Sequence, residues 1–180
     1  MGRVVEEAEA LERLILMRHG EAERPAPGLR DIDRDLDATG RQESRAIGFA
    51  LAEAGIVPDL ALLSAAKRTM ETWRAAGEAF PQASVEEDPS LYAASAVRLA
   101  AAVGVQAGRS KVLIVIGHNP GIHQYAIHLA RQGGASKEAA GPLFERFPTG
   151  TAAVFNMPAG APPMLERLFL AKHYRDKSPP

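Results

Sequence analysis

Short apolar runs alternate with longer amphipathic stretches along most of the chain. The apolar runs are strand-sized, and several end abruptly in polar residues or glycine, as a buried strand does when it emerges into a loop. The predicted strands cover residues 14–17, 60–63, 112–116, 151–156 and 165–170, with a weaker one near Val85. The predicted helices cover residues 39–54, 65–80, 94–105 and 120–131.

Local signals mark where three of these helices begin. Thr39 and Gln42 match a capping box, in which each side chain satisfies a free backbone N–H group. Ser64 is predicted to cap the second helix. Asn119 is predicted to cap the fourth, with Pro120 at its first position.

The alternation of strands and helices predicts an α/β fold. We expect a three-layer sandwich with a largely parallel central sheet and helices on both faces. Because no helix separates the last two strands, at least one antiparallel pairing is expected. Residues 21–38 and 132–148 are predicted as loops, without regular periodicity.

The length of 180 residues predicts a single domain, because it suffices for one sizeable core and is short for two. We place the core of this domain at about residues 12–171. Residues 1–10 and 172–180 are interpreted as flanking segments.

Composition excludes several function classes. The 21 Lys and Arg residues against 22 Asp and Glu give a net charge of -1 without a basic block, so a nucleic-acid partner is not expected. With no Cys, the chain has no disulfides, thiolate metal sites or Cys nucleophiles. No apolar run approaches the about 20 residues of a membrane span. The N-terminus lacks the apolar core of a signal peptide, and we predict a cytoplasmic location.

Three predicted strands deliver cationic or imidazole side chains at their ends. Arg18 and His19 follow the first, Ser64 leads to Arg68 after the second, and His118 follows the third. Ligands of open α/β sheets bind beyond the carboxyl ends of the strands, so these side chains are expected to converge. Arginine donors match phosphate oxygens, and such a pocket favours a dianion.

The segments that carry these residues resemble the histidine phosphatase superfamily. They are LILMRHGEAE at residues 14–23, which contains the RHG signature, LLSAAKRTMET at residues 62–72 and VIGHNPG at residues 115–121. Within the superfamily, the short length, Leu91-Tyr92 and FPTG at residues 147–150 are most similar to the SixA-type protein phosphohistidine phosphatases. The resemblance covers residues 14 to about 170 and implies a phosphoglycerate mutase-like fold.

The resemblance implies a role for each pocket residue. His19 would be the nucleophile, Arg18 and Arg68 the phosphate clamps, and His118 the second imidazole. Arg18, Arg68 and His118 would bind the substrate, without a metal or another cofactor. Neutral His19 would attack phosphorus to form a phosphohistidine intermediate that water hydrolyses. We attribute the neutrality of His19 to the two neighbouring guanidinium charges.

A general acid for the leaving group is not assigned by the sequence. Glu21, Glu86, Glu87 and Asp88 lie in or near the expected regions, but none sits in a matching local motif. Each is interpreted as a surface carboxylate or a supporting partner.

His123, His128 and His173 are interpreted as packing or surface residues. His118, His123 and His128 are five apart, which on a helix points them in different directions and argues against a metal site. Trp73 and Phe80 are predicted to contribute to the core.

The preferred hypothesis is a protein phosphohistidine phosphatase that acts on a phosphorylated protein. A small-molecule phosphomonoesterase with a small phosphorylated substrate is the first alternative. A phosphoglycerate mutase is less favoured, since the chain has little room for the insertions of that enzyme class. A non-catalytic phosphate-binding module is disfavoured because all four pocket residues occur together. The sequence does not indicate an oligomeric state.

Overall fold

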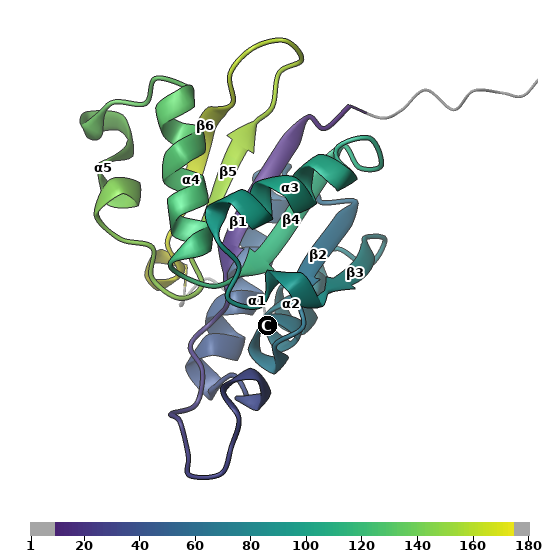
Figure 1. Ribbon diagram of the computed structural model, residues 1–180, viewed down its shortest axis with the longest axis vertical. Coiled ribbons are helices and arrows are strands. Elements are labelled where there is room, and N and C mark those ends of the chain that lie inside the picture. Colours follow the sequence, from purple (N-terminus) through teal and green to yellow (C-terminus); the bar gives the residue numbers. More distant parts are fainter. Residues whose placement is uncertain (1–9, 175–180) are drawn as a thin grey trace, which may run out of the picture.

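A six-stranded sheet forms the middle layer of the computed structural model, which describes residues 10–174 (Figure 1). Its strands follow the order β3-β2-β4-β1-β5-β6. The strands are β1 (Arg13–Arg18), β2 (Leu60–Ser64), β3 (Ser84–Asp88), β4 (Val112–Gly117), β5 (Ala152–Asn156) and β6 (Met164–Phe169). The helices are α1 (Ala38–Glu53), α2 (Lys67–Ala76), α3 (Ala96–Gln106), α4 (Gly121–Gln132) and α5 (Lys137–Glu145).

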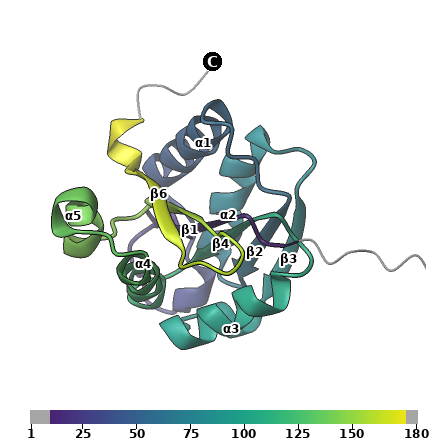
Figure 2. The ribbon, with the colours of Figure 1, turned by 90° about the horizontal axis from the view of Figure 1, so that it is seen from above.

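The helices lie on both faces of this sheet, as predicted. Figure 2 shows α1 and α2 on one face and α3 and α4 on the other. Strands β1 to β4 pair in parallel, whereas β5 is antiparallel to β1 and β6 is antiparallel to β5. The three-layer α/β prediction is therefore confirmed, and the expected antiparallel pairing extends to β1.

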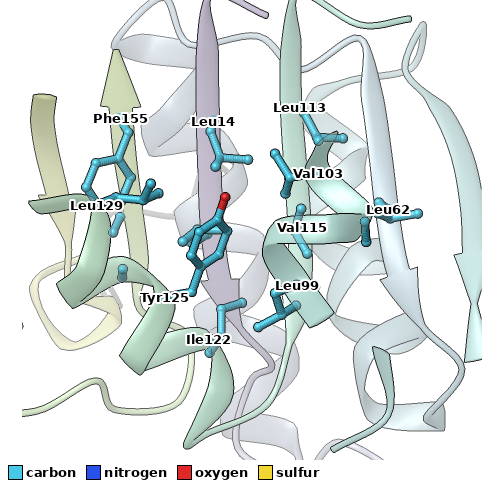
Figure 3. Close-up of a cluster of buried hydrophobic side chains, with 14 of the residues drawn as sticks. Leu14, Leu62, Leu99, Val103, Leu113, Val115, Ile122, Tyr125, Leu129 and Phe155 are labelled. Atoms are coloured by element: carbon cyan, nitrogen blue, oxygen red, sulfur yellow. The ribbon is translucent and has the colours of Figure 1, made fainter. Parts of the chain in front are cut away.

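Alternating side chains of the central strands fill two separate cores. Leu14 and Leu16 of β1 pack in the cluster under α3 and α4, part of which Figure 3 shows. Ile15 and Met17 pack on the opposite face, in the cluster under α1 and α2. If β1 shifted by one residue along its neighbours, its side chains would exchange the two faces of the sheet. Both faces are apolar here, so hydrophobicity alone does not fix the register, and the shapes of the packed side chains and the polar residues at the strand ends must do so. In the register observed, Arg18 lies beside Gly117 at the carboxyl edge.

The predicted cap of the first helix is wrong. Helix α1 begins one residue before Thr39, and the Asp37 carboxylate caps it by accepting a hydrogen bond from the Gly40 backbone N–H at 2.7 Å. A carboxylate at the N-terminus of a helix also interacts favourably with the helix dipole. Thr39 therefore lies within the first turn.

The predicted caps of the second and fourth helices are also wrong. Helix α2 starts later than expected and has no side-chain cap, and the same is true of α4. The Ser64 hydroxyl contacts His118 instead, and the Asn119 amide donates to the Phe147 carbonyl oxygen at 2.9 Å. Both side chains therefore contact residues outside the helices that they were predicted to cap.

The two predicted loops contain some regular structure. The segment 132–148 was expected to be irregular but contains α5, which is kinked at Ala140 and has Pro142 inside it. The adjacent glycine and proline hide its helical pattern. The loop 21–38 carries a short 3₁₀ turn at Asp31–Asp33 and a bridge between Ala22 and Leu36.

The weaker predictions of structure hold. The strand expected near Val85 is β3, an edge strand parallel to β2. Helix α2 ends earlier than Phe80, but Trp73 and Phe80 are both buried in the core with their rings stacked at 6.2 Å.

Close packing of α1 on α2 requires a glycine at position 48. A Cβ atom there would collide with the backbone carbonyl of Ala76. We expect Gly48→Ala to lower the free energy of unfolding by about 1–3 kcal/mol, because the two helices must move apart. Gly104→Ala in α3 is the matched control, since its Cβ meets nothing, and helix propensity should stabilise it by about 0.5–1 kcal/mol. Urea denaturation of both variants measures the difference, and equal effects would contradict the packing argument.

Candidate active site

The predicted pocket residues lie at the carboxyl edge of β1, β2 and β4. His19 and His118 each follow a strand, and their ring centroids are 5.1 Å apart. Arg68, in the first turn of α2, lies against both rings, with its Nε 3.3 Å from His19 Nε2 and its Nη2 3.3 Å from His118 Nδ1. The three side chains are buried, at 8%, 7% and 6% exposure for His19, His118 and Arg68.

His19 is held so that its ring nitrogen Nε2 is unprotonated and accepts the long hydrogen bond from Arg68 Nε. Its Nδ1 lies 2.7 Å from the Gly20 carbonyl oxygen. A carbonyl only accepts hydrogen bonds, so Nδ1 carries the proton and Nε2 is the basic nitrogen. The backbone of His19 is fixed on both sides, since its N–H donates to Gly117 O at 3.1 Å and its carbonyl accepts from Gly150 N at 3.0 Å.

The His19 imidazole is neutral near physiological pH. The pKa of His19 is lowered to about 3, chiefly because burial disfavours the charged ring. The Gly20 carbonyl opposes this shift, while His118, Arg68 and Arg18 add to it. The guanidinium charges therefore act in the predicted direction, but burial is the larger cause.

His118 presents its own basic nitrogen to the same space. Its Nε2 lies 2.8 Å from the Ser64 hydroxyl oxygen, and Nδ1 accepts the long contact from Arg68. Burial, followed by the charge of Arg68, lowers the pKa of His118 to about 4. Ser64 is a functional partner that sequence reasoning missed, because serine after a strand is also a common helix cap.

Arg18 lies beside the imidazoles and has unused hydrogen-bonding capacity. One guanidinium nitrogen, Nη1, donates to the Phe147 carbonyl oxygen at 3.0 Å. Its Nε is buried and has no partner among residues 10–174. A buried N–H without a partner is costly, which suits a position where an anion binds. The charge of Arg18 also lowers the pKa of both His19 and His118.

Asp31 is a pocket residue that the sequence analysis missed. Its carboxylate oxygen Oδ2 accepts from Arg68 Nη2 at 2.9 Å and from the Tyr92 hydroxyl at 2.7 Å. Its backbone carbonyl accepts from Arg68 Nη1 at 2.6 Å. Asp31 lies in a loop without periodicity, so only tertiary structure brings it to Arg68. The one available signal was Tyr92, which the resemblance to SixA-type proteins singled out.

Asp31 is ionised and so does not donate a proton. The hydrogen bond from Tyr92 is the largest cause that holds the pKa of Asp31 far below its usual range, and those from Arg34 and Arg68 act in the same direction. Protein carboxylates that act as general acids have a raised pKa. Asp31 is therefore a fixed negative charge.

The four acid candidates from the sequence are not hydrogen-bonded in the pocket, although the charge of Glu21 acts on Arg18 and opposes the lowering of its pKa by burial. Within residues 10–174, none of them hydrogen-bonds to a pocket side chain. Glu86 pairs with Arg109, Asp88 with Ser90 and Arg98, and Glu21 accepts from Thr149, while Glu87 is exposed. The structure thus gives them the supporting and surface roles that the sequence analysis preferred.

The remaining histidines of α4 are structural or on the surface. His123 contacts the Leu143 carbonyl oxygen at 2.6 Å and stacks on Phe147, and His128 is exposed. No group of three or more His, Cys, Asp or Glu side chains in the described part of the chain is arranged to hold a metal ion. The same residues include no helix long and apolar enough to cross a membrane.

Fold and site together define an α/β protein whose pocket places a neutral imidazole beside two arginines. The model of the histidine phosphatase superfamily (branch 1) matches residues 14–96. This match covers just under half of the chain and agrees with the resemblance of its sequence motifs to the histidine phosphatase superfamily.

A curated protein is similar to part of the chain. An uncharacterized chloroplastic protein of Arabidopsis thaliana is 34% identical over 128 residues, which is 66% of this chain and 59% of that protein. The chain therefore spans less than two thirds of the length of this relative.

Two solved structures are similar over almost their whole length. A candidate phosphohistidine phosphatase, SixA, from Agrobacterium tumefaciens has a TM-score of 0.78 and 26% identity, with 89% of this chain and 98% of that one covered. The corresponding protein from Nakamurella multipartitia has a TM-score of 0.76 and 28% identity, with 88% and 95% covered. These matches confirm the predicted resemblance and its phosphoglycerate mutase-like fold.

The lowered pKa values of the two imidazoles predict their titration. Both are below 6.5, so His19 and His118 should stay neutral as the pH falls from 8 to 5 and gain protons only near pH 3 to 4. Ring ¹⁵N chemical shifts at each pH measure this, and should also show the proton of His19 on Nδ1. Imidazolium shifts for either ring at pH 6 would contradict the burial argument.

Proposed function

We propose that the protein is a phosphatase that works through a phosphohistidine enzyme intermediate. One observation carries the proposal: the buried, basic Nε2 of His19 faces Arg68 while the Gly20 carbonyl holds the proton on Nδ1. A neutral imidazole with one free lone pair is a nucleophile, and an adjacent guanidinium attracts the phosphoryl oxygens.

Each pocket residue then has a role in two successive displacements. His19 Nε2 attacks phosphorus, and Arg18 and Arg68 bind the phosphoryl oxygens as charge builds up on them. A bound dianion raises the pKa of His118. The ring can then be protonated and donate a hydrogen bond to the same oxygens. Water hydrolyses the phosphorylated His19 in the second displacement. The chain supplies all this positive charge itself, so we propose no metal and no other cofactor.

We infer that the preferred substrate is a protein that carries phosphohistidine. Two observations support this: the similarity to candidate phosphohistidine phosphatases, and a pocket carboxylate that is ionised. An alkoxide leaves poorly without an acid, whereas an imidazole with a pKa of about 6.5 departs more readily.

Other properties stay predictions. A small-molecule phosphomonoesterase remains the alternative function, and a non-catalytic phosphate-binding module the third. A single domain over residues 1–180, a cytoplasmic location and the absence of a nucleic-acid partner remain part of the proposal.

Substitution of His19 tests the intermediate. His19→Ala should abolish turnover of p-nitrophenyl phosphate and also the acid-labile phosphoryl label that rapid quenching traps on the protein. His128→Ala is the matched control because His128 is an exposed imidazole of α4, and it should keep both. Retained labelling in His19→Ala would assign the nucleophile to another residue. Normal phosphate binding without turnover in the wild-type protein would favour the binding module.

A substrate panel tests the leaving group. We expect kcat/KM to be much higher for phosphohistidine peptides and p-nitrophenyl phosphate than for phosphoserine peptides or sugar phosphates. Released phosphate, assayed in the presence of EDTA, gives the comparison, and the chelator should not change the order. Equal efficiency on the alkyl phosphates would mean that an acid acts in the site and would favour the phosphomonoesterase.

A further inference from the structure

The carboxylate of Asp31 lies between the buried pocket and solvent. It is tied to the Arg68 guanidinium, whose side chain is only 7% exposed, yet its own side chain is 51% exposed. Arg68 in turn contacts His19 through Nε, and the same Nη2 atom that pairs with Asp31 also contacts His118 Nδ1. Asp31 is therefore half-exposed to solvent and also close to His118, where its negative charge opposes the lowering of the His118 pKa by burial.

This carboxylate is fixed by three separate parts of the chain. Arg68 belongs to α2, Tyr92 follows β3, and Arg34 of the same loop donates to Asp31 Oδ1 at 2.9 Å. Arg34 is itself held, because its Nε and Nη2 donate to the Glu23 carbonyl oxygen at 2.9 and 2.7 Å. These hydrogen bonds fix the position of the Asp31 carboxylate, unlike that of a mobile surface side chain.

The neck of the loop adds to this rigidity. Ala22 and Leu36 form an antiparallel bridge, and the Leu36 N–H donates to the buried Glu71 carboxylate at 2.8 Å. The segment that carries Asp31 is therefore anchored to α2 after the 3₁₀ turn, and the bridge from Ala22 to Leu36 holds the part before it.

The Asp31 carboxylate still has acceptor capacity. An ionised carboxylate offers about four acceptor positions and no donor. Tyr92, Arg68 and Arg34 use three of these positions. Because the Asp31 side chain is half-exposed, the remaining position is accessible from solvent. A ligand group that binds there must be an N–H donor or a cation.

We propose that Asp31 accepts a hydrogen bond from the substrate's imidazole leaving group, at the ring nitrogen that is not bonded to phosphorus. This role rests on the proposed phosphatase function and makes Asp31 a specificity-determining residue. An alkyl phosphate would offer no such N–H group to this carboxylate.

The proton on that ring nitrogen replaces the missing general acid. As His19 Nε2 forms its bond to phosphorus, the substrate's P–N bond breaks and its electron pair returns to the leaving nitrogen. The step requires the substrate ring in its protonated, imidazolium form, which the negative charge of Asp31 favours; its other ring nitrogen then carries a proton, the leaving group is neutral imidazole, and no proton needs to move. Without that proton, the leaving group would be the strongly basic imidazolate.

The enzyme's own histidine follows the same chemistry in the second step. Phosphorylated His19 keeps its Nδ1 proton, which the Gly20 carbonyl accepts. Water attacks phosphorus, the P–N bond breaks, and its electron pair returns to Nε2 of a neutral ring. The protons of the attacking water go to the phosphate product and to solvent. Asp31 would thus accept a hydrogen bond from the substrate ring, as the Gly20 carbonyl accepts one from His19.

The variant Asp31→Asn tests the proposal, with Asp33→Asn as the matched control. Asp33 lies in the same 3₁₀ turn, but its carboxylate pairs with exposed Arg30. Asp31→Asn should lower kcat/KM for a phosphohistidine peptide by about 10- to 100-fold, the usual effect of losing a hydrogen bond to a charged group. The loss of kcat/KM for p-nitrophenyl phosphate should be about tenfold smaller, because nitrophenolate has no N–H group and shares only the loss of the contact between Asp31 and Arg68. Asp33→Asn should change neither.

A merely structural role of Asp31 gives a different result. If Asp31 only holds Arg68 in place, Asp31→Asn lowers kcat/KM for both substrates alike and weakens inhibition by vanadate, which would overturn the proposal. Unchanged turnover of both substrates would overturn it as well.

Binding separates this proposal from the phosphatase function. His19→Ala protein should bind a non-hydrolysed phosphohistidine peptide, and adding Asp31→Asn should weaken that binding about tenfold or more, whether or not the wild-type protein turns the peptide over. Equal binding by the single and double variants would overturn the role of Asp31. Failure of the wild-type protein to form a phosphohistidine intermediate would overturn the proposed function instead.

Discussion

The buried guanidinium of Arg68 is the interaction on which the pocket depends. It joins His19, His118 and Asp31, three residues that come from different parts of the chain. A buried charge is tolerated only when it is paired and hydrogen-bonded, so the surroundings of Arg68 are constrained as a group. Two threonines of α2 hold the backbone around Arg68: Thr69 donates to Ser64 O at 2.6 Å, and Thr72 donates to Arg68 O at 2.7 Å.

The sequence predicted the parts of this arrangement that depend on strands. Apolar runs identified β1, β2 and β4, and the rule that ligands bind at the carboxyl ends of parallel strands placed His19, Arg68 and His118 together. The caps failed because Ser64 and Asn119 have two physically reasonable uses, a helix end or a pocket contact, and local sequence does not distinguish them. Asp31 was beyond prediction, since its role comes from Arg68 and Tyr92 and not from its neighbours in the loop.

Burial explains the chemistry of the imidazoles better than the nearby positive charges do. The sequence analysis credited the arginines with keeping His19 neutral, but the fold places both rings below the surface, where the charged form loses its hydration. Each ring is then oriented by one fixed partner, the Gly20 carbonyl for His19 and the Ser64 hydroxyl for His118. A neutral ring in a defined tautomer follows from packing and needs no base beside it.

The backbone at Gly20 links the packing of α1 to the orientation of His19. Its carbonyl orients His19, while its N–H donates to Thr72 Oγ1 at 2.9 Å, so the same residue links the nucleophile to the helix that carries Arg68. A Cβ atom at Gly20 would lie 2.7 Å from the Gly40 carbonyl oxygen, and one at Gly40 would collide with the backbone of Glu21. Two facing glycines therefore let the loop after β1 approach α1 closely enough to set the Gly20 carbonyl. The tautomer of His19 is in this way a consequence of backbone contact with α1, which the RHG signature alone does not contain.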